Sequence, residues 1–258
     1  MGRFDGATVL ITGAAGGLGQ GAAKGFATEG ARLVLSDIDE KALADLAGTL
    51  RAETAILAGN IADESLSEDL VRLAVEKFGR LDIAVNNAGI VQSFVRLPHV
   101  ASDEARRVLE IDLLGVFYAM KHQIPQMERQ FKATGKGGAI VNIASAAGLS
   151  GAPKLSVYAA AKHGVIGLTR SAAIEYATKG LRINAICPAH TRTAMMDGFV
   201  RLSGVPEAEA LAELTRGVPM KRVAEVEEIV TAILFAADPA NSFMTGHALA
   251  VDGGIGAI

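Results

Sequence analysis

The chain has 258 residues, of which 50% are hydrophobic and 21% charged, with a formal net charge of -3 and a pI near 6.0. This length suits one large α/β domain with its own core, and we expect a single domain over residues 1–258. The slightly acidic balance, without any lysine or arginine run, excludes a general attraction to nucleic acid or to an anionic membrane.

The single cysteine, Cys187, cannot form an internal disulfide, which favours a reducing compartment. The N-terminus leads almost directly into a strand-like segment and shows no secretion signal. The longest apolar run, residues 229–237 with Thr231 inside it, is far too short to span a membrane. We therefore expect a cytoplasmic protein.

Short apolar segments rich in β-branched residues alternate with helix-like segments along the chain. We expect strands over residues 7–11, 31–35, 55–58, 81–85, 139–143, 181–186 and 247–251. We expect helices from the first glycine turn to residue 29 and over residues 39–52, 63–78, 103–129, 157–178 and 225–237. The segment 195–222 is less regular. Asp63 and Ser65 are predicted to cap the helix that runs to Phe78. Seven strands with helices between them predict a Rossmann-type, doubly wound parallel sheet with helices on both faces.

The first predicted strand ends at a glycine-rich turn that leads into a helix. The turn runs from Gly13 through Gly16, Gly17 and Leu18 to Gly19. Such a turn lets the backbone approach a pyrophosphate closely, and the helix N-terminus offers free N–H groups and the positive end of its dipole. A flexible turn without a ligand is the alternative interpretation.

Asp37 ends the second predicted strand. An acidic side chain there can accept hydrogen bonds from the adenosine ribose hydroxyls and repels a 2′-phosphate. Ile38 follows it, and no basic residue lies between Gly13 and Gly19. The sequence therefore favours NAD over NADP, with a solvated strand-end aspartate as the plainer alternative.

Tyr158 and Lys162 are four residues apart in an alanine-rich helical segment, so they share one helix face. A free tyrosine, whose pKa is about 10, is too weak a base at neutral pH, and a neighbouring ammonium group favours the phenolate. On its own, the pair also suits a packed tyrosine and a solvated lysine, because this spacing is common on helices.

Several motifs together resemble the short-chain dehydrogenase/reductase family over essentially the whole chain. The glycine motif of the family is matched by Thr12, Gly13, Gly17 and Gly19, its Asn-Asn-Ala-Gly motif by Asn86, Asn87, Ala88 and Gly89, and its serine, placed 13 residues before the Tyr-x-x-x-Lys pair, by Ser145. Four motifs in this order are far more specific than any one of them.

The resemblance implies a role for each member of the catalytic set. Tyr158 would exchange a proton with the substrate oxygen, Lys162 would support the phenolate and hold the nicotinamide ribose, and Ser145 would hydrogen-bond the substrate oxygen. The implied cofactor contacts come from Gly13, Gly16, Gly17, Leu18, Gly19, Asp37, Ile38, Asn60, Ile61, Asn87, Ala88, Gly89, Tyr158, Lys162, Pro188, Thr191 and Thr193.

Three positions depart from the family pattern. Asp112 replaces an asparagine whose backbone carbonyl holds a water of the proton relay. The carbonyl survives, so Asp112 stays a candidate catalytic residue, but a carboxylate nearby would disfavour the phenolate. Asn60 replaces an aspartate near the adenine, and Ala189 replaces the glycine of a Pro-Gly motif beside the nicotinamide.

The remaining candidates are weaker. The five histidines have no metal-ligand spacing, so we predict no metal site, and only His190 is placed near the active site. The apolar side chains from Met195 to Leu202 fall where the family has a mobile substrate-covering segment, here about residues 190–222. They indicate an apolar or cyclic substrate, although packing against a neighbouring subunit explains them equally well.

The leading interpretation is an NAD-dependent oxidoreductase that transfers a hydride between the nicotinamide and a secondary alcohol or ketone. One alternative is an NADPH-dependent 3-oxoacyl-carrier-protein reductase or another carbonyl reductase, against which Asp37 argues. Another is a non-catalytic dinucleotide-binding protein, against which the intact Ser145, Tyr158 and Lys162 argue. We expect a small-molecule substrate, no nucleic acid or membrane partner and, by resemblance, a homotetramer. The identity of the substrate is beyond the sequence, because loop residues set it.

Overall fold

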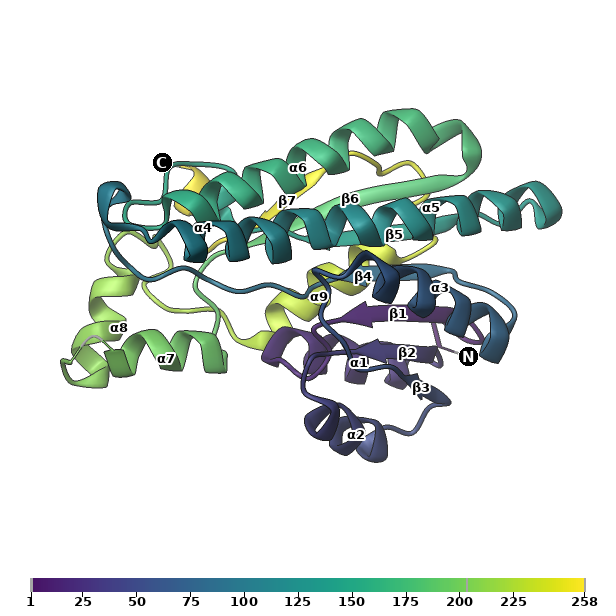
Figure 1. Cartoon of the computed structure of the whole chain (residues 1–258), viewed down its shortest axis with the longest axis horizontal. Helices are drawn as coiled ribbons and strands as arrows, with labels where there is room; N and C mark the ends of the chain where they lie inside the picture. The colour runs from purple at the N-terminus through teal and green to yellow at the C-terminus, as the bar shows by residue number, and fades with distance from the viewer. Residues whose placement is uncertain (1, 203, 258) are drawn as a thin grey trace.

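The computed structural model describes residues 2–202 and 204–257, with the backbone alone at residues 195, 199, 201 and 202. Its centre is one parallel sheet of seven strands in the order β3-β2-β1-β4-β5-β6-β7 (Figure 1). The strands are β1 (Thr8–Thr12), β2 (Arg32–Ser36), β3 (Thr54–Ile56), β4 (Ile83–Asn86), β5 (Gly138–Ile143), β6 (Leu181–Pro188) and β7 (Ala248–Val251). The predicted Rossmann-type sheet is confirmed.

Helices cover both faces of this sheet. They are α1 (Gly17–Thr28), α2 (Glu40–Thr49), α3 (Glu64–Phe78), α4 (Ser102–Leu109), α5 (Gly115–Thr134), α6 (Ser156–Tyr176), α7 (Ala194–Leu202), α8 (Glu207–Thr215) and α9 (Val226–Ala237). The core beneath α1, α2 and α9 is separate from the core beneath α3, α5 and α6. Figure 1 shows α7 and α8 outside these layers, beyond the carboxyl ends of the strands.

The strand order explains why β1 carries a continuous apolar run, residues 9–11, between two buried threonines. All of its residues are buried, with Val9 and Ile11 in one core and Leu10 in the other. A strand buried on both faces needs a continuous apolar run rather than an alternating one. The sheet grows outward from β1 in both directions, first to β2 and then to β4. Because β2 and β4 lie on opposite sides of β1, the connections after β1 and β4 lead to opposite sides and leave a crevice at the carboxyl ends of these two strands. Ligands bind in this crevice in such sheets.

Four local predictions need correction. Asp63 is the N-cap residue of α3, as predicted, but its side chain makes no capping bond; the Leu66 N–H donates to the Asp63 backbone carbonyl at 3.1 Å instead. Ser65 lies inside α3 rather than at its cap. The predicted helix 103–129 is divided into α4, a π-helical segment Glu110–Leu114, and α5.

The last correction concerns the stretch 195–222, predicted to be less regular, which holds α7 and α8. Helix α8 follows Pro206 and carries Glu207 and Glu209 in its first turn. Proline before a helix and acidic residues in its first turn are ordinary start signals. The apolar side chains predicted at Met195, Phe199 and Leu202 lie outside the described side chains.

None of the helices in residues 2–202 and 204–257 is both long and apolar enough to cross a membrane.

Candidate active site

A cavity of about 800 Å³ lies at the carboxyl ends of the strands. It gathers every site residue that the sequence singled out except Gly19. Gly19 is buried in α1, where a side chain would clash with the carbonyl oxygen of Gly13. Gly19 therefore permits close packing of α1 on the turn and does not face the cavity.

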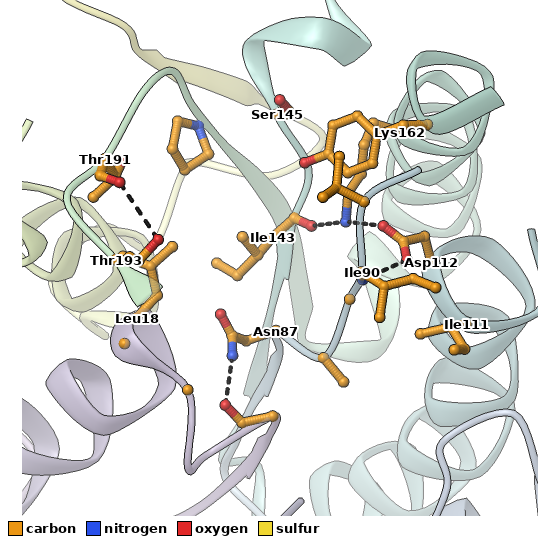
Figure 2. A pocket seen from close by; sticks show the side chains of 18 of the residues that line it. Leu18, Asn87, Ile90, Ile111, Asp112, Ile143, Ser145, Lys162, Thr191 and Thr193 are labelled. Atoms are coloured by element: carbon orange, nitrogen blue, oxygen red, sulfur yellow. Dashed lines mark hydrogen bonds and ion pairs between the residues drawn. The ribbon is translucent and has the colours of Figure 1, made fainter. Parts of the chain in front are cut away.

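The glycine turn at the end of β1 is fixed by the Asn-Asn-Ala-Gly segment. Asn87 Nδ2 donates to the carbonyl oxygens of Thr12 at 3.1 Å and Gly13 at 3.0 Å (Figure 2). Thr12 Oγ1 in turn accepts the backbone N–H groups of Asn87 and Ala88 at 3.1 and 3.2 Å. Gly13 has a φ of +63°, and a Cβ there would lie 2.8 Å from the Ala88 Cα. A side chain at Gly13 would push these two segments apart.

The N-terminus of α1 opens into this cavity. Its N-cap is Gly16, and within the described residues the first turn has neither a side-chain cap nor an acidic group. The first N–H groups of a helix need partners from outside, and the helix dipole favours an anion beside them. A pyrophosphate fits this end of the cavity.

Asp37 lies at the end of β2, further along the same wall. Its Oδ2 accepts the Ala15 N–H at 2.9 Å and its Oδ1 accepts the Asp39 N–H at 3.2 Å. These bonds hold the carboxylate against the glycine turn. Ile38 beside it is 74% exposed, so the adjacent surface is apolar rather than basic. This end of the cavity suits a ribose with free hydroxyls.

At the other end of the cavity, α6 carries Tyr158 and Lys162, and the loop after β5 carries Ser145. Lys162 Nζ lies 5.5 Å from the centroid of the Tyr158 ring. Ser145 Oγ accepts the Ala147 N–H at 3.1 Å, which starts a short 3₁₀ turn and fixes the serine side chain. The three groups that the sequence separates therefore line one cavity.

Asp112 forms a buried ion pair with Lys162. The Asp112 Oδ2 lies 3.2 Å from Lys162 Nζ, and the Asp112 Oδ1 accepts the Ile90 N–H at 2.8 Å (Figure 2). Lys162 Nζ also donates to the Ile143 carbonyl at 3.2 Å. Asp112 is 0% exposed and Lys162 is 4% exposed. The π-helical segment between α4 and α5 presents this carboxylate to α6, as π-bulges often do at functional sites.

The surroundings of Lys162 decide its charge. Burial, the largest single influence, lowers the pKa of Lys162, but the Asp112 carboxylate, together with Tyr158, outweighs burial and raises the pKa above its ordinary value. Lys162 is therefore an ammonium group at neutral pH. A side chain at Gly89 would meet Asp112 Oδ2 at 3.2 Å and Lys162 Nζ at 3.3 Å. The glycine leaves room for the ion pair.

Two further titratable groups lie beside this set. His190 lines the cavity, and burial lowers its pKa, so it is neutral at pH 7. Cys187 is fully buried behind Ser145, and burial raises the pKa of its thiol to about 11. A protonated, buried thiol is not a nucleophile.

Sequence reasoning missed the apolar wall of the cavity. Its side chains come from widely separated segments and include Val91, Phe94, Leu155, Leu214 and Ile255. Met196, which the sequence placed in the substrate-covering segment, also lines the cavity. No motif marks these positions, because each is an ordinary apolar residue in its own segment. Sequence reasoning also missed the buried hydrogen bonds of Asn86 to Gln123 and Asn142, which tie β4 to α5 and β5 beneath the site.

Comparison with known proteins places this site in a family. The sequence profile of a family described as enoyl-(acyl carrier protein) reductase matches residues 13–256. An uncharacterized oxidoreductase from Thermotoga maritima is 40% identical, over 99% of this chain and 100% of that protein. The chain belongs to the short-chain dehydrogenase/reductase family. It is therefore an oxidoreductase with a dinucleotide-binding fold.

Short-chain dehydrogenases with assigned substrates are also similar to this chain. A cyclohexanol dehydrogenase from Acinetobacter sp. (strain SE19) is 37% identical, over 97% of this chain and 95% of that protein. The crystal structure of levodione reductase superimposes with a TM-score of 0.93 at 34% identity, covering 99% of each chain.

Both nicotinamide cofactors occur among the similar structures. An NAD⁺-bound xylitol dehydrogenase has a TM-score of 0.91 at 32% identity, over 97% of this chain and 99% of that chain. ElxO with NADP bound has a TM-score of 0.89 at 31% identity, over 98% of this chain and 99% of that chain. Family membership therefore leaves the choice between NAD and NADP to the residues of this chain.

Proposed function

We propose that this short-chain dehydrogenase/reductase oxidises a secondary alcohol to a ketone with NAD. One observation carries the proposal: a single cavity holds Ser145, Tyr158 and Lys162 at one end and Asp37 beside the exposed Ile38 at the other. The first end suits proton transfer at a substrate oxygen, and the second suits an adenosine ribose without a 2′-phosphate.

The cofactor would be held by the lining residues that extend from the glycine turn to Lys162, called the cofactor wall below. The N–H groups at the start of α1 would bind the pyrophosphate, and Asp37 would accept hydrogen bonds from the adenosine ribose. Lys162 would bind the nicotinamide ribose. The lining residues Asn60, Ile61, Pro188, Thr191 and Thr193 would complete this wall. When bound, NAD supplies the hydride acceptor for the reaction.

The side chains at the Ser145 end of the cavity would carry out the proton transfer. Ser145 Oγ would hold the substrate oxygen by a hydrogen bond, while the Tyr158 phenolate takes the hydroxyl proton as the C–H bond gives up its hydride. The ammonium group of Lys162 favours the phenolate. Asp112 would keep that ammonium group charged and in place, and its backbone carbonyl is the proposed acceptor for a water that returns the Tyr158 proton to solvent.

We propose an apolar, compact or cyclic substrate. The lining of the cavity that holds Ser145 includes Phe94, Leu155, Leu214 and Ile255, which offer apolar contacts. Helices α7 and α8 form much of residues 190–222, and Met196 and Leu214 of this segment line the cavity. We therefore propose that the segment covers the substrate. Similarity to a cyclohexanol dehydrogenase supports this substrate class.

A panel of secondary alcohols tests the function. NADH formation would be followed with cyclohexanol, short aliphatic alcohols, cyclic diols, steroids and sugars, with NADP in parallel. We expect turnover of a cyclic or apolar alcohol with NAD and at least tenfold less with NADP. Faster turnover with NADP would favour a carbonyl reductase of the 3-oxoacyl-carrier-protein type. NADH binding without turnover of any alcohol or ketone would favour a non-catalytic dinucleotide-binding protein.

We further propose that residues 1–258 act as one domain, in the cytoplasm and as a homotetramer. One sheet extends from β3 to β7, which supports a single domain. Large apolar side chains are exposed at Phe117 on α5, Ile174 on α6 and Phe243 before β7, where 41%, 82% and 104% of their surface is accessible. Such residues suit subunit contacts. Light scattering would test the assembly, and a monomer would refute it without affecting the chemistry.

A further inference from the structure

The helix that carries Tyr158 begins without a cap of its own. Helix α6 starts at Ser156, and its N-cap residue is Leu155, which has no side-chain acceptor. The free N–H groups in the first turn of a helix need partners from outside that turn. Gln92, from the loop after β4, supplies one: its Oε1 accepts the N–H of Val157 at 2.8 Å and the N–H of Tyr158 at 2.9 Å.

The Gln92 side chain is buried and hydrogen-bonded at both ends of its amide. It is 1% exposed, and its Nε2 donates to the Lys154 carbonyl at 3.4 Å. Lys154 has a φ of +67°, a left-handed conformation that is uncommon for a residue with a side chain. The amide of Gln92 thus bonds to both the unusual turn before α6 and the first turn of α6. A buried amide with partners at both ends is rigid.

The loop of Gln92 also contacts the other end of the catalytic pair. Ile90 N–H donates to Asp112, the ion-pair partner of Lys162. Ser93, which follows Gln92, donates from its N–H and Oγ to Glu104 of α4 at 2.6 and 2.8 Å. One short loop therefore holds both the first turn of α6 at Tyr158 and the carboxylate beneath Lys162.

We propose that Gln92 is a positioning residue for Tyr158. By replacing the missing cap, it keeps the first turn of α6 formed and the phenol aligned with Ser145 and the nicotinamide. Without the cap, two buried N–H groups lose their acceptor and the first turn frays. Small displacements of a reacting group reduce turnover strongly. The inference rests on the proposed dehydrogenase reaction.

Three variants test it with cyclohexanol, or the fastest alcohol of the panel, and NAD. Gln92→Met keeps the length of the side chain and removes the acceptor. Gln92→Glu keeps an acceptor for both N–H groups at a helix N-terminus that favours negative charge, and loses only the long donor bond to the Lys154 carbonyl. The matched control is Gln130→Met at the opposite end of the sheet. The Gln130 Oε1 likewise accepts two bonds, from the Leu81 N–H and Gln126 Nε2, and its Nε2 likewise donates to a carbonyl, that of Leu81.

We expect Gln92→Met to lower kcat roughly tenfold or more, with the Kd of NADH within about twofold of wild type. Gln92→Glu should recover most of kcat, and Gln130→Met should lose stability without losing kcat. Amide hydrogen exchange at residues 156–160 should accelerate in Gln92→Met only. If Gln92→Met does not fold, the shorter Gln92→Asn, which cannot reach both N–H groups, should show the same loss of kcat.

Two results would overturn the assignment: wild-type kcat in Gln92→Met or Gln92→Asn, or an equal loss of kcat in Gln130→Met. Tyr158→Phe separates this failure from a failure of the proposed reaction. If Gln92 has no role but the reaction is right, Tyr158→Phe alone is inactive. If the reaction is wrong, either wild type turns over none of the alcohols or Tyr158→Phe is as active as wild type.

Discussion

The two walls of the cavity are built in different ways. On the cofactor wall, backbone groups at strand ends are fixed by a few side chains, such as Asn87 on the turn at Gly13 and Asp37 on Ala15. On the substrate wall, apolar side chains come from the loop after β4, the turn before α6, helices α7 and α8, and the C-terminal tail.

The difference shows where specificity is set in this molecule. The cofactor wall uses backbone geometry, which the sheet imposes and which requires particular residues, above all glycine. The substrate wall needs only apolar side chains of suitable size, and many sequences meet that need. Changes in the first wall or in the catalytic set should therefore have large, qualitative effects, and changes in the second should have small, graded ones.

The largest effect is expected from Lys162→Met. It removes the cation beside Tyr158 and leaves the Asp112 carboxylate buried without a partner. We expect loss of measurable turnover, weaker NADH binding and a decrease of about 3–5 kcal/mol in the free energy of unfolding, measured in urea. The double variant Lys162→Met/Asp112→Leu should regain stability but not activity. A stable single variant would contradict the importance of the ion pair.

Asp112→Asn tests the same ion pair through pH. Because the pKa of Lys162 is raised in the folded state, its pairing stabilises the protein below the ordinary lysine pKa of about 10.4 and is lost as pH rises through the higher folded value. Without the carboxylate, burial disfavours the ammonium group at neutral pH. The stability gap between wild type and variant should be about 3 kcal/mol at pH 7 and should shrink above about pH 10. A gap that does not change with pH would count against this account.

Asp37→Ser tests the choice of cofactor. Loss of the carboxylate should weaken NADH binding roughly tenfold and allow NADPH to bind, because the repulsion of a 2′-phosphate is removed. Titration calorimetry with both cofactors measures the change. The control is Asp45→Ser on α2, which removes an equal charge outside the described lining of the cavity. Asp45 Oδ2 lies 3.5 Å from Lys41 Nζ. If both variants changed cofactor binding equally, the effect of Asp37 would come from net charge and not from contact with the ribose.

The smallest effect is expected on the substrate wall. Leu214→Ala on α8 removes apolar contact and should raise the KM for a cyclic alcohol about three- to tenfold, leaving the Kd of NADH unchanged. Leu211→Ala on the same helix is the control, since Leu211 is absent from the described lining of the cavity. A change in NADH affinity would show that this helix serves the cofactor rather than the substrate.

The same contrast explains what the sequence could predict. The succession of strands along the chain and the strand-end motifs follow from hydrophobic runs and glycine turns, so the type of sheet and nearly all the cofactor-wall residues were identified. The ion pair of Asp112 was not, because a π-helical segment turns that carboxylate toward Lys162 and no spacing rule predicts such a segment. The cap from Gln92 was missed because it joins residues that are 65 and 66 positions apart. Helices α7 and α8 were missed although Pro206 and the acidic residues after it mark the start of α8.

The most direct test compares wild type with Tyr158→Phe in NADH formation from NAD and a cyclic secondary alcohol, with NADH binding measured on both. We predict turnover by wild type, a loss of roughly 10²–10⁴-fold in kcat for the variant, and equal NADH affinity. Equal turnover by the two proteins would contradict the central claim that Tyr158 transfers the proton.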